Sequence, residues 1–303
     1  MPAPVRVRAL AAVVVLALPL SGCALLRGRT DAVVLGVGST TEQRMLAALT
    51  VVALDRAGIA TQMRADLGGT LGLRREGLRR QIDLWWDYTG AAWALGLGEQ
   101  APAADPVESY ERVRRADEER GLVWLEPSAA NATLALFVRA EDLPAEGQPR
   151  GLSWLAGRLS SGEANLCADP DFVRRRGGLD ALAEAYAIGL DRVRVAAARE
   201  DRAVAQVAAG RCFAGLATAT SGAARAAGLL PVADELGIFP AFIVAPVARE
   251  VVLTARPALR DALAGLARVL DTRALGELNR AVHGGEDPAQ LAEAFLAQET
   301  VLR

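Results

Sequence analysis

Apolar runs of strand length alternate with stretches of helical periodicity along most of the chain. Residues 32–38, Ala-Val-Val-Leu-Gly-Val-Gly, form a continuous apolar run, which is typical of a strand buried on both faces of a parallel sheet. At residues 39–42, Ser-Thr-Thr-Glu, the spacing of hydroxyl and carboxylate predicts a capping box, and apolar residues then recur every three or four positions. The pattern predicts one strand-helix unit.

The same alternation continues through the middle of the chain. Further strands are expected at residues 61–65, 82–86, 123–125, 134–139, 164–167, 192–196 and 212–217, and residues 243–247 form a further apolar stretch. A Gly68-Gly69 turn precedes an expected helix over 70–80, and Asp105-Pro106 marks another helix start. After Phe239-Pro240, helices are expected at 257–270, 272–282 and 288–296. The order predicts an α/β fold of mainly parallel sheets flanked by helices.

The N-terminal segment has the features of an export signal. Arg6 and Arg8 precede an apolar stretch at residues 9–20, which is shorter than the roughly 20 residues that span a bilayer. Leu20-Ser21-Gly22-Cys23 resembles the lipobox of a bacterial lipoprotein precursor. We therefore expect a signal peptide over 1–23, ending at a lipidated Cys23, and a protein anchored at the extracytoplasmic face of the cytoplasmic membrane. The alternative is an ordinary secretory peptide in which Cys23 is incidental.

The composition is that of a globular protein with a small net charge. Hydrophobic residues make up 52% and charged residues 23% of 303 residues, enough for two lobes of ordinary domain size. The net charge of -2 gives no basic surface for nucleic acid, so no nucleic-acid partner is expected. All 34 basic residues are arginine. An anionic group on a ligand must therefore be held by a guanidinium, a helix N-terminus or backbone amides.

Few residues suit acid-base or metal chemistry. The single histidine, His283, does not readily assemble a catalytic triad or a zinc site, so we expect neither an enzyme nor a metal or other cofactor. Gly36-Val37-Gly38 starts like a dinucleotide fingerprint, but Thr41 holds the third glycine position, which favours a tight turn. Cys167 and Cys212 form a disulfide if their strands are neighbours, or remain two buried thiols.

Aromatic residues are scarce but clustered. They make up 5% of the chain, yet Trp85, Trp86, Tyr88 and Trp93 fall in one short segment at the C-terminal end of a predicted strand. Open α/β sheets bind ligands at that end of their strands. These rings either line a ligand site or fill the core between sheet and helix, and Trp93 is the best candidate for core.

Seven blocks of sequence resemble the substrate-binding subunits of osmoprotectant ABC importers, which take up glycine betaine, choline and related quaternary ammonium compounds. The blocks are residues 36–43, 67–70, 82–84 leading to 88–90, 121–127, 131–136, 237–240 and 245–247. The resemblance implies a two-lobed type II periplasmic-binding-protein fold whose chain crosses twice between lobes. It places lobe 1 at 31–131 and 235–303, and lobe 2 at 132–234.

The resemblance also implies a ligand site. A quaternary ammonium group has no N–H, so aromatic faces hold it by cation-π attraction of about 0.5 to 2 kcal/mol per ring. The family's rings correspond to Tyr88 and Phe242, and its carboxylate-binding arginine to Arg175. Two other cage positions fall on Leu134 and Thr218, which are not aromatic.

A family lysine in the first strand-helix turn falls near Gly38, so a second cationic group is absent. Trp85 and Trp86 are expected to restore part of the aromatic surface, while Ser39 and the amides after Gly38 orient a carboxylate. Thr218 and Asn131 are expected polar contacts. The missing groups have two alternative explanations: the aromatic cage is repacked around a related cation, or the site is specific for a less charged or bulkier solute.

The expected function is that of a non-enzymatic receptor that closes two lobes around a small solute and delivers it to a permease with its ATPase. An orphan sensor or structural lipoprotein that no longer binds quaternary amines is the alternative. An enzyme on the same scaffold is disfavoured by the shortage of acid-base residues.

Overall fold

Two five-stranded sheets organise the residues that the computed structural model describes, which are 32–97, 105–145, 148, 150–175 and 177–301. The first sheet has the order β2 (Thr61–Arg64), β1 (Val33–Gly36), β3 (Leu84–Tyr88), β10 (Val244–Arg249) and β4 (Leu122–Trp124). The second has the order β7 (Arg194–Ala197), β6 (Asn165–Ala168), β8 (Ala214–Thr218), β5 (Leu134–Arg139) and β9 (Leu229–Pro231). The expected signal peptide and Cys23 lie outside the described residues.

Each sheet is mainly parallel, as expected, with one reversed strand. In the first, β1 is parallel to β2 and β3, whereas β10 is antiparallel to β3 and β4. In the second, β6 is parallel to β7 and β8, whereas β5 is antiparallel to β8 and β9. The reversed strands, β5 and β10, are those that the chain enters directly from the other sheet. They lack a helical crossover, which would return the chain to the opposite end of the sheet.

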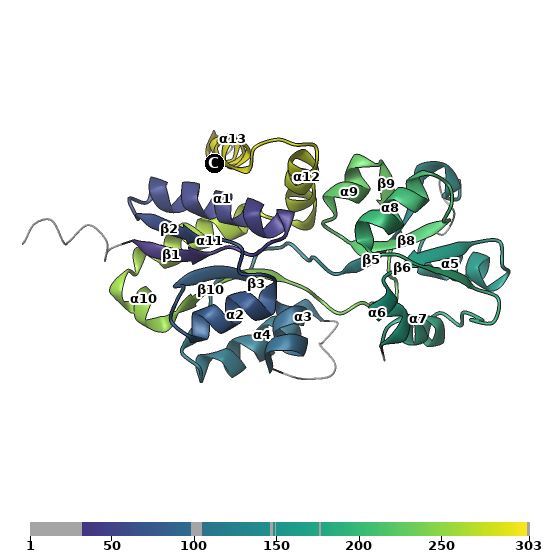
Figure 1. The fold of residues 1–303 in the computed structure, drawn as a ribbon, viewed down its shortest axis with the longest axis horizontal. Helices are drawn as coiled ribbons and strands as arrows, with labels where there is room; N and C mark the ends of the chain where they lie inside the picture. Colours follow the sequence, from purple (N-terminus) through teal and green to yellow (C-terminus); the bar gives the residue numbers. More distant parts are fainter. Residues whose placement is uncertain (1–31, 98–104, 146–147, 149, 176, 302–303) are drawn as a thin grey trace, which may run out of the picture. The chain divides into compact units, whose positions relative to one another are not determined.

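Helices cover both sheets (Figure 1). Those associated with the first are α1 (Thr41–Arg56), α2 (Thr70–Leu78), α3 (Thr89–Ala91), a π-helical turn (Ala92–Leu97), α4 (Pro106–Glu118), α10 (Glu250–Ala255), α11 (Ala258–Val269), α12 (Thr272–His283) and α13 (Pro288–Val301). Those associated with the second are a 3-10 turn (Ala140–Asp142), α5 (Leu152–Ser160), α6 (Pro170–Arg174), α7 (Leu179–Ala185), α8 (Glu200–Ala208) and α9 (Gly222–Ala226). In the described part of the chain, no helix has the length and apolarity needed to cross a membrane.

The first helix starts one residue later than the sequence pattern predicts. Thr40 is the N-cap of α1: its Oγ1 accepts from the backbone N–H of Gln43 at 3.1 Å, and Oε1 of Gln43 accepts from the N–H of Thr40 at 3.3 Å. The predicted pairing of Ser39 with Glu42 is therefore wrong by one position. Because Gln43 completes the capping box, the carboxylate of Glu42 is available for other contacts.

Strand β3 is covered on both faces, and this decides where its tryptophans go. Trp85 packs against α2 and α4, in a cluster with Leu73 and Val113, and is 0% exposed. Trp86 points to the other face, in a cluster with Met45 of α1, and is 3% exposed. Successive side chains of a strand alternate between faces, so two neighbouring rings enter two separate cores.

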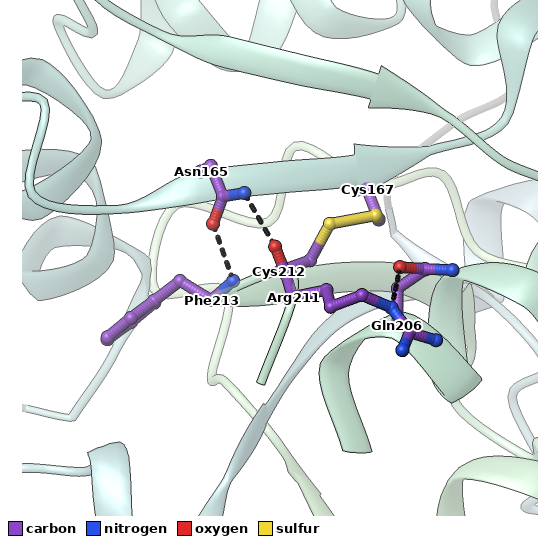
Figure 2. Close-up of a disulfide and its surroundings, with 6 residues drawn as sticks. All are labelled: Asn165, Cys167, Gln206, Arg211, Cys212 and Phe213. Carbon is purple, nitrogen blue, oxygen red and sulfur yellow. Dashed lines mark hydrogen bonds between the residues drawn. A yellow bond between two sulfur atoms is a disulfide. The ribbon is translucent and has the colours of Figure 1, made fainter. Parts of the chain in front are cut away.

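A disulfide joins two strands of the second sheet (Figure 2). Cys167 on β6 and Cys212 just before β8 have Cα atoms 5.9 Å apart, and both side chains are buried. Beside it, Asn165 donates from Nδ2 to the carbonyl of Arg211 at 2.9 Å and accepts from the N–H of Phe213 at 2.8 Å. The disulfide and these bonds tie the start of β8 to β6.

Two segments carry the chain between the sheets, one from β4 to β5 and one from β9 to β10. They meet at an isolated antiparallel bridge between Asn131 and Ile243. Next to it, Thr133 donates from Oγ1 to the carbonyl of Pro240 at 2.6 Å. Thr89 also holds the second segment, since its Oγ1 donates to Ala241 O at 3.1 Å and accepts from Ile243 N at 3.0 Å. The crossing segments are thus hydrogen-bonded to each other and to the end of β3.

Candidate functional site

A cavity of about 720 Å³ collects residues from both sheets at the point where the crossing segments meet. On the side of the first sheet, the lining includes the N-terminus of α1, the end of β3 and part of α12. On the side of the second sheet, it includes the first residue of β5, the last residue of β8 and the start of α8. This volume lies within the range of small-molecule pockets. The sequence-predicted residues that line it are Ser39, Tyr88, Arg175, Thr218 and Phe242.

Two aromatic side chains line the cavity from neighbouring strands. Tyr88 is the last residue of β3 and pairs with Val244, two residues after Phe242. Gly90 makes room for the second ring, because a Cβ at that position would lie 2.5 Å from a ring carbon of Phe242. Both rings are half-buried. The end of β3 and the segment just before β10 therefore each place an aromatic side chain in the cavity lining.

A carboxylate that the sequence analysis missed lies beside Tyr88. Glu42 accepts from Tyr88 Oη at 2.7 Å through Oε1 and from Asn279 Nδ2 at 2.7 Å through Oε2. Burial raises the pKa of Glu42, and hydrogen bonds from Thr220, Tyr88 and Asn279 partly offset that rise. Burial, followed by the Glu42 charge, raises the pKa of Tyr88 well above its usual value, which keeps its hydroxyl a donor. In the sequence, Thr40 as the N-cap leaves Glu42 without a local capping partner, but only the fold places it beside Tyr88.

A second carboxylate reaches the same cavity from the other sheet. Glu200, the first residue of α8, accepts from the backbone N–H of Thr218 at 3.1 Å and from its hydroxyl at 3.5 Å. Burial raises the pKa of Glu200, hydrogen bonds from Ser221 and Thr218 lower it, and the nearby charges of Asp201 and Glu42 raise it further. Thr218, expected as a polar ligand contact, lines the cavity, and its hydroxyl donates to Glu200.

Two arginines also line the cavity. Arg175, at the end of α6, is exposed, and its guanidinium lies 5.7 Å from the ring centroid of Phe172. Arg44 lies on the first turn of α1 and donates to the carbonyl of Ser39 at 3.1 Å. Charged groups of both signs therefore surround the cavity, with Asp201 and the two glutamates opposing the arginines.

The structure does not bring Trp85 and Trp86 into the cavity, which corrects their predicted role as aromatic walls. Trp85 donates from Nε1 to Asp87 at 3.2 Å, and Trp86 donates to Oγ1 of Thr50 at 2.7 Å. Strand β3 continues to Tyr88, two residues past its predicted end. The tryptophans consequently lie inside the strand rather than at its open end.

Asn131 is also not among the lining residues, which corrects its predicted role as a polar ligand contact. Its Oδ1 accepts from the backbone N–H of Thr133 at 3.2 Å and of Phe242 at 2.8 Å, and its own N–H donates to Thr272 at 2.9 Å. These bonds occupy the side-chain oxygen with the backbone of the crossing segments. Asn131 is therefore a structural residue of these segments.

The two positions where the resemblance implies missing rings are neighbours in space. Leu134 and Thr218 are direct partners in the β5–β8 ladder, and both line the cavity. At Gly38, a Cβ would lie 1.9 Å from Oε1 of Gln43, so the capping side chain fills the place that a lysine would need. Among the described residues, no group of three His, Cys, Asp or Glu side chains is arranged to hold a metal ion.

Comparison with known proteins places the chain among solute-binding proteins. The sequence profile of the substrate binding domain of ABC-type glycine betaine transport systems matches residues 31–298. The glycine betaine-binding protein YehZ of Escherichia coli K12 is 30% identical over 269 residues, which are 86% of this chain and 88% of YehZ. A glycine-betaine-binding protein of Pseudomonas aeruginosa is 29% identical over 285 residues, 88% of each chain.

Solved structures of similar proteins have the same fold. The apo form of YehZ from Escherichia coli superposes with a TM-score of 0.78 at 28% identity, covering 89% of this chain and 99% of that one. A glycine betaine/carnitine/choline ABC transporter structure gives 0.81 at 20% identity, covering 88% and 98%, and shows the fold. The chain therefore belongs to the family of substrate-binding domains of ABC-type glycine betaine transport systems, non-enzymatic solute-binding subunits on a two-lobed α/β fold.

Proposed function

We propose that this chain captures a small osmoprotectant of the glycine betaine or choline type in the 720 Å³ cavity and presents it to an ABC permease and its ATPase. The supporting observation is that Tyr88 and Phe242 line the cavity together, at the meeting point of the crossing segments. Two ring faces offer a methylated ammonium group about 0.5 to 2 kcal/mol each. The relatives' names, both glycine betaine-binding proteins, point to the same class of solute.

A carboxylate on the solute has two candidate partners. Arg175 presents an exposed guanidinium, which forms two parallel hydrogen bonds to a carboxylate. At the start of α1, the backbone amides of Thr41 and Glu42 belong to the first turn, which has no earlier carbonyls to bond. Ser39 adds an exposed hydroxyl beside them. The predicted lobes, 31–131 with 235–303 and 132–234, would close on the solute by bending at the crossing segments.

The proposal includes a lipid anchor on Cys23. Substrate-binding proteins of ABC importers act outside the cytoplasm, where a tether keeps the receptor near its permease. The disulfide between Cys167 and Cys212 supports this location, since structural disulfides persist in oxidising compartments. Globomycin, which blocks lipoprotein signal cleavage, should cause the uncleaved precursor to accumulate. Unchanged processing would contradict the anchor.

Isothermal titration calorimetry of the full-length protein tests the binding proposal. We expect saturable binding of glycine betaine or choline, and loss of that binding in Tyr88→Ala. The control is Tyr110→Phe, because the Tyr110 hydroxyl bonds to Leu125 O at 2.7 Å and Tyr110 is not among the residues that line the cavity. The absence of heat with every quaternary amine would contradict import of this class and favour the sensor alternative.

A further inference from the structure

Two helices that belong to different sheets pack against each other beside the cavity (Figure 1). α9 lies between β8 and β9 of the second sheet, and its first two residues, Gly222 and Ala223, line the cavity. α12 packs on α1 of the first sheet, where Leu275 and Met45 share a core cluster. The chain passes through β9, β10 and α11 between the two helices. Their contact is therefore a noncovalent link between the two sheets, additional to the crossing segments.

Two glycines allow the close approach of α9 and α12. A Cβ at Gly222 would lie 2.3 Å from the carbonyl oxygen of Asn279 and 2.8 Å from the backbone nitrogen of Arg280. A Cβ at Gly276 of α12 would lie 2.0 Å from Nε of Arg225 on α9. A larger residue at Gly222 would meet the backbone of α12, which cannot turn aside as a flexible side chain can. Side chains other than hydrogen at this position must therefore push the two helices apart.

Polar bonds hold the same contact. Arg225 pairs through Nη1 with Oε1 of Glu277 at 3.3 Å, and its Nη2 lies 3.5 Å from the carbonyl oxygen of Thr272. Nδ2 of Asn279 donates to the carbonyl of Thr220, two residues before α9, at 3.0 Å. Arg225 and Glu277 are not among the residues that line the cavity. Any contribution of this pair to solute binding must therefore pass through the α9–α12 contact.

The link continues into the wall of the cavity. Nδ2 of Asn279, which bonds Thr220, also donates to Oε2 of Glu42 on α1 at 2.7 Å. Oε1 of Glu42 accepts from Tyr88 Oη at 2.7 Å. Asn279 is 4% exposed, and hydrogen bonds shielded from water are stronger than exposed ones. One amide thus joins the segment before α9 to the carboxylate that holds the Tyr88 hydroxyl.

We propose that the α9–α12 contact is a restraint that holds the two sheets in the arrangement in which both line the cavity. The inference goes beyond the proposed function, because the restraint acts in the solute-free protein whichever solute binds. Apparent affinity falls in proportion to the fraction of molecules in the binding-competent arrangement. The contact raises that fraction, so weakening it lowers the affinity for a solute that the cavity accepts.

Small-angle X-ray scattering of the full-length protein without solute tests the restraint. Gly222→Leu sets a side chain against the α12 backbone, although leucine is a better helix former than glycine. We expect a larger radius of gyration than in the wild type. The control is Gly157→Leu on α5, where a Cβ meets nothing within 4 Å, and it should leave the radius unchanged. A wild-type radius in Gly222→Leu would overturn the inference.

A charge exchange tests the contact without adding bulk, and it decides the question if Gly222→Leu fails to fold. Arg225→Glu sets two acidic groups side by side. The solute-free radius should grow, and calorimetry should show an affinity for choline or glycine betaine about fivefold lower. Arg225→Glu combined with Glu277→Arg restores opposite charges and should recover most of both changes. The control is Arg192→Glu, whose partner Asp191 is its neighbour in the chain, outside the cavity lining.

The exchange separates the restraint from a local effect of Arg225 and from the proposed function. Equal radii and affinities in Arg225→Glu and in the exchanged pair would overturn the restraint, since only a contact across the helices depends on the sign at position 277. Tighter binding in Arg225→Glu would overturn it as well, because the contact would then oppose the binding arrangement. A wild type that binds neither solute would contradict the proposed function alone, because the radii still test the restraint.

Discussion

Oδ1 of Asn131 accepts a hydrogen bond from the backbone N–H of Phe242 at 2.8 Å, across 111 residues of sequence. The bond joins the two segments that cross between the sheets, at the residue whose ring lines the cavity. One side chain therefore couples the crossing geometry to the aromatic surface. Asn131 belongs to a sequence block that resembles the family, yet its role is to support the site.

Replacing Asn131 with alanine should lower the free energy of unfolding by about 1–3 kcal/mol, because the N–H groups of Thr133 and Phe242 lose their acceptor. Solute affinity should fall as well, since Phe242 is no longer held. Urea unfolding and calorimetry measure the two effects. Asn131→Asp keeps an acceptor oxygen and should recover part of both, so equal losses in the two variants would contradict this role.

Arg74→Met should be strongly destabilising. Arg74 donates to Asp117 at 2.7 and 2.9 Å and to Asp87 at 3.2 Å, and all three side chains are buried. Removing the guanidinium leaves two buried carboxylates without their positive partner, which costs about 3–5 kcal/mol. The adjacent Arg75→Met is the control, because Arg75 is largely exposed and its partner Glu76 keeps ion pairs with Arg64 and Arg79, so the loss should cost at most about 1 kcal/mol. Similar denaturant midpoints for the two variants would refute the prediction.

Replacing both Cys167 and Cys212 with alanine should lower the free energy of unfolding by about 4 kcal/mol, the loop-entropy value for a bridge between residues 45 apart. The unfolded chain gains freedom when the bridge is lost, while the β6–β8 pairing remains. Thermal unfolding with and without reductant measures the change. Reductant should destabilise the wild type and leave the double variant unaffected, and a reductant effect on both proteins would contradict the explanation.

Leu134→Tyr should strengthen the binding of quaternary amines. The substitution adds a ring at a lining position opposite Thr218, where cation-π attraction of about 0.5 to 2 kcal/mol corresponds to roughly a twofold to thirtyfold gain in affinity. Calorimetry with choline and glycine betaine gives the gain. Leu236→Tyr, an exposed leucine outside the lining, is the control. Weaker binding in Leu134→Tyr would show that this position cannot face the solute.

Glu42→Gln should stabilise the empty protein more as the pH rises. Burial raises the folded-state pKa of Glu42 above 4.5, so its stabilising contribution is complete below pH 4.5 and is lost as the pH rises through the folded-state pKa. Glutamine never takes a charge. The difference in unfolding temperature between variant and wild type should therefore be smallest near pH 4 and largest near pH 8. A constant difference over this range would show that Glu42 is not desolvated in the folded protein.

Much of the fold could be predicted from local patterns. The strand expected at 134–139 is β5, and the helix expected at 272–282 is α12, one residue longer. Periodicity and caps identify such elements because they depend on near neighbours in the sequence. The direction of β5 and β10 could not be predicted in this way, because it depends on which sheet the chain has just left.

The site was less predictable than the fold. The family resemblance indicates Tyr88 and Phe242, and both line the cavity, whereas Trp85 and Trp86 lie in the core, because aromatic clustering does not distinguish a pocket from a core. Glu42 was overlooked since a one-residue error in the capping frame gave its carboxylate a local partner.

The sequence by itself determined the alternation of strands and helices, because that alternation depends on short-range patterns, and it indicated the family through blocks spread along the chain. Only the tertiary structure decided that both tryptophans are core and that Glu42 and Glu200, from different sheets, line one cavity. Glu42, Glu200 and Asn279 are far apart in the chain. Packing that brings α1, α8 and α12 together places them in one cavity lining, and this cannot be predicted from any local pattern.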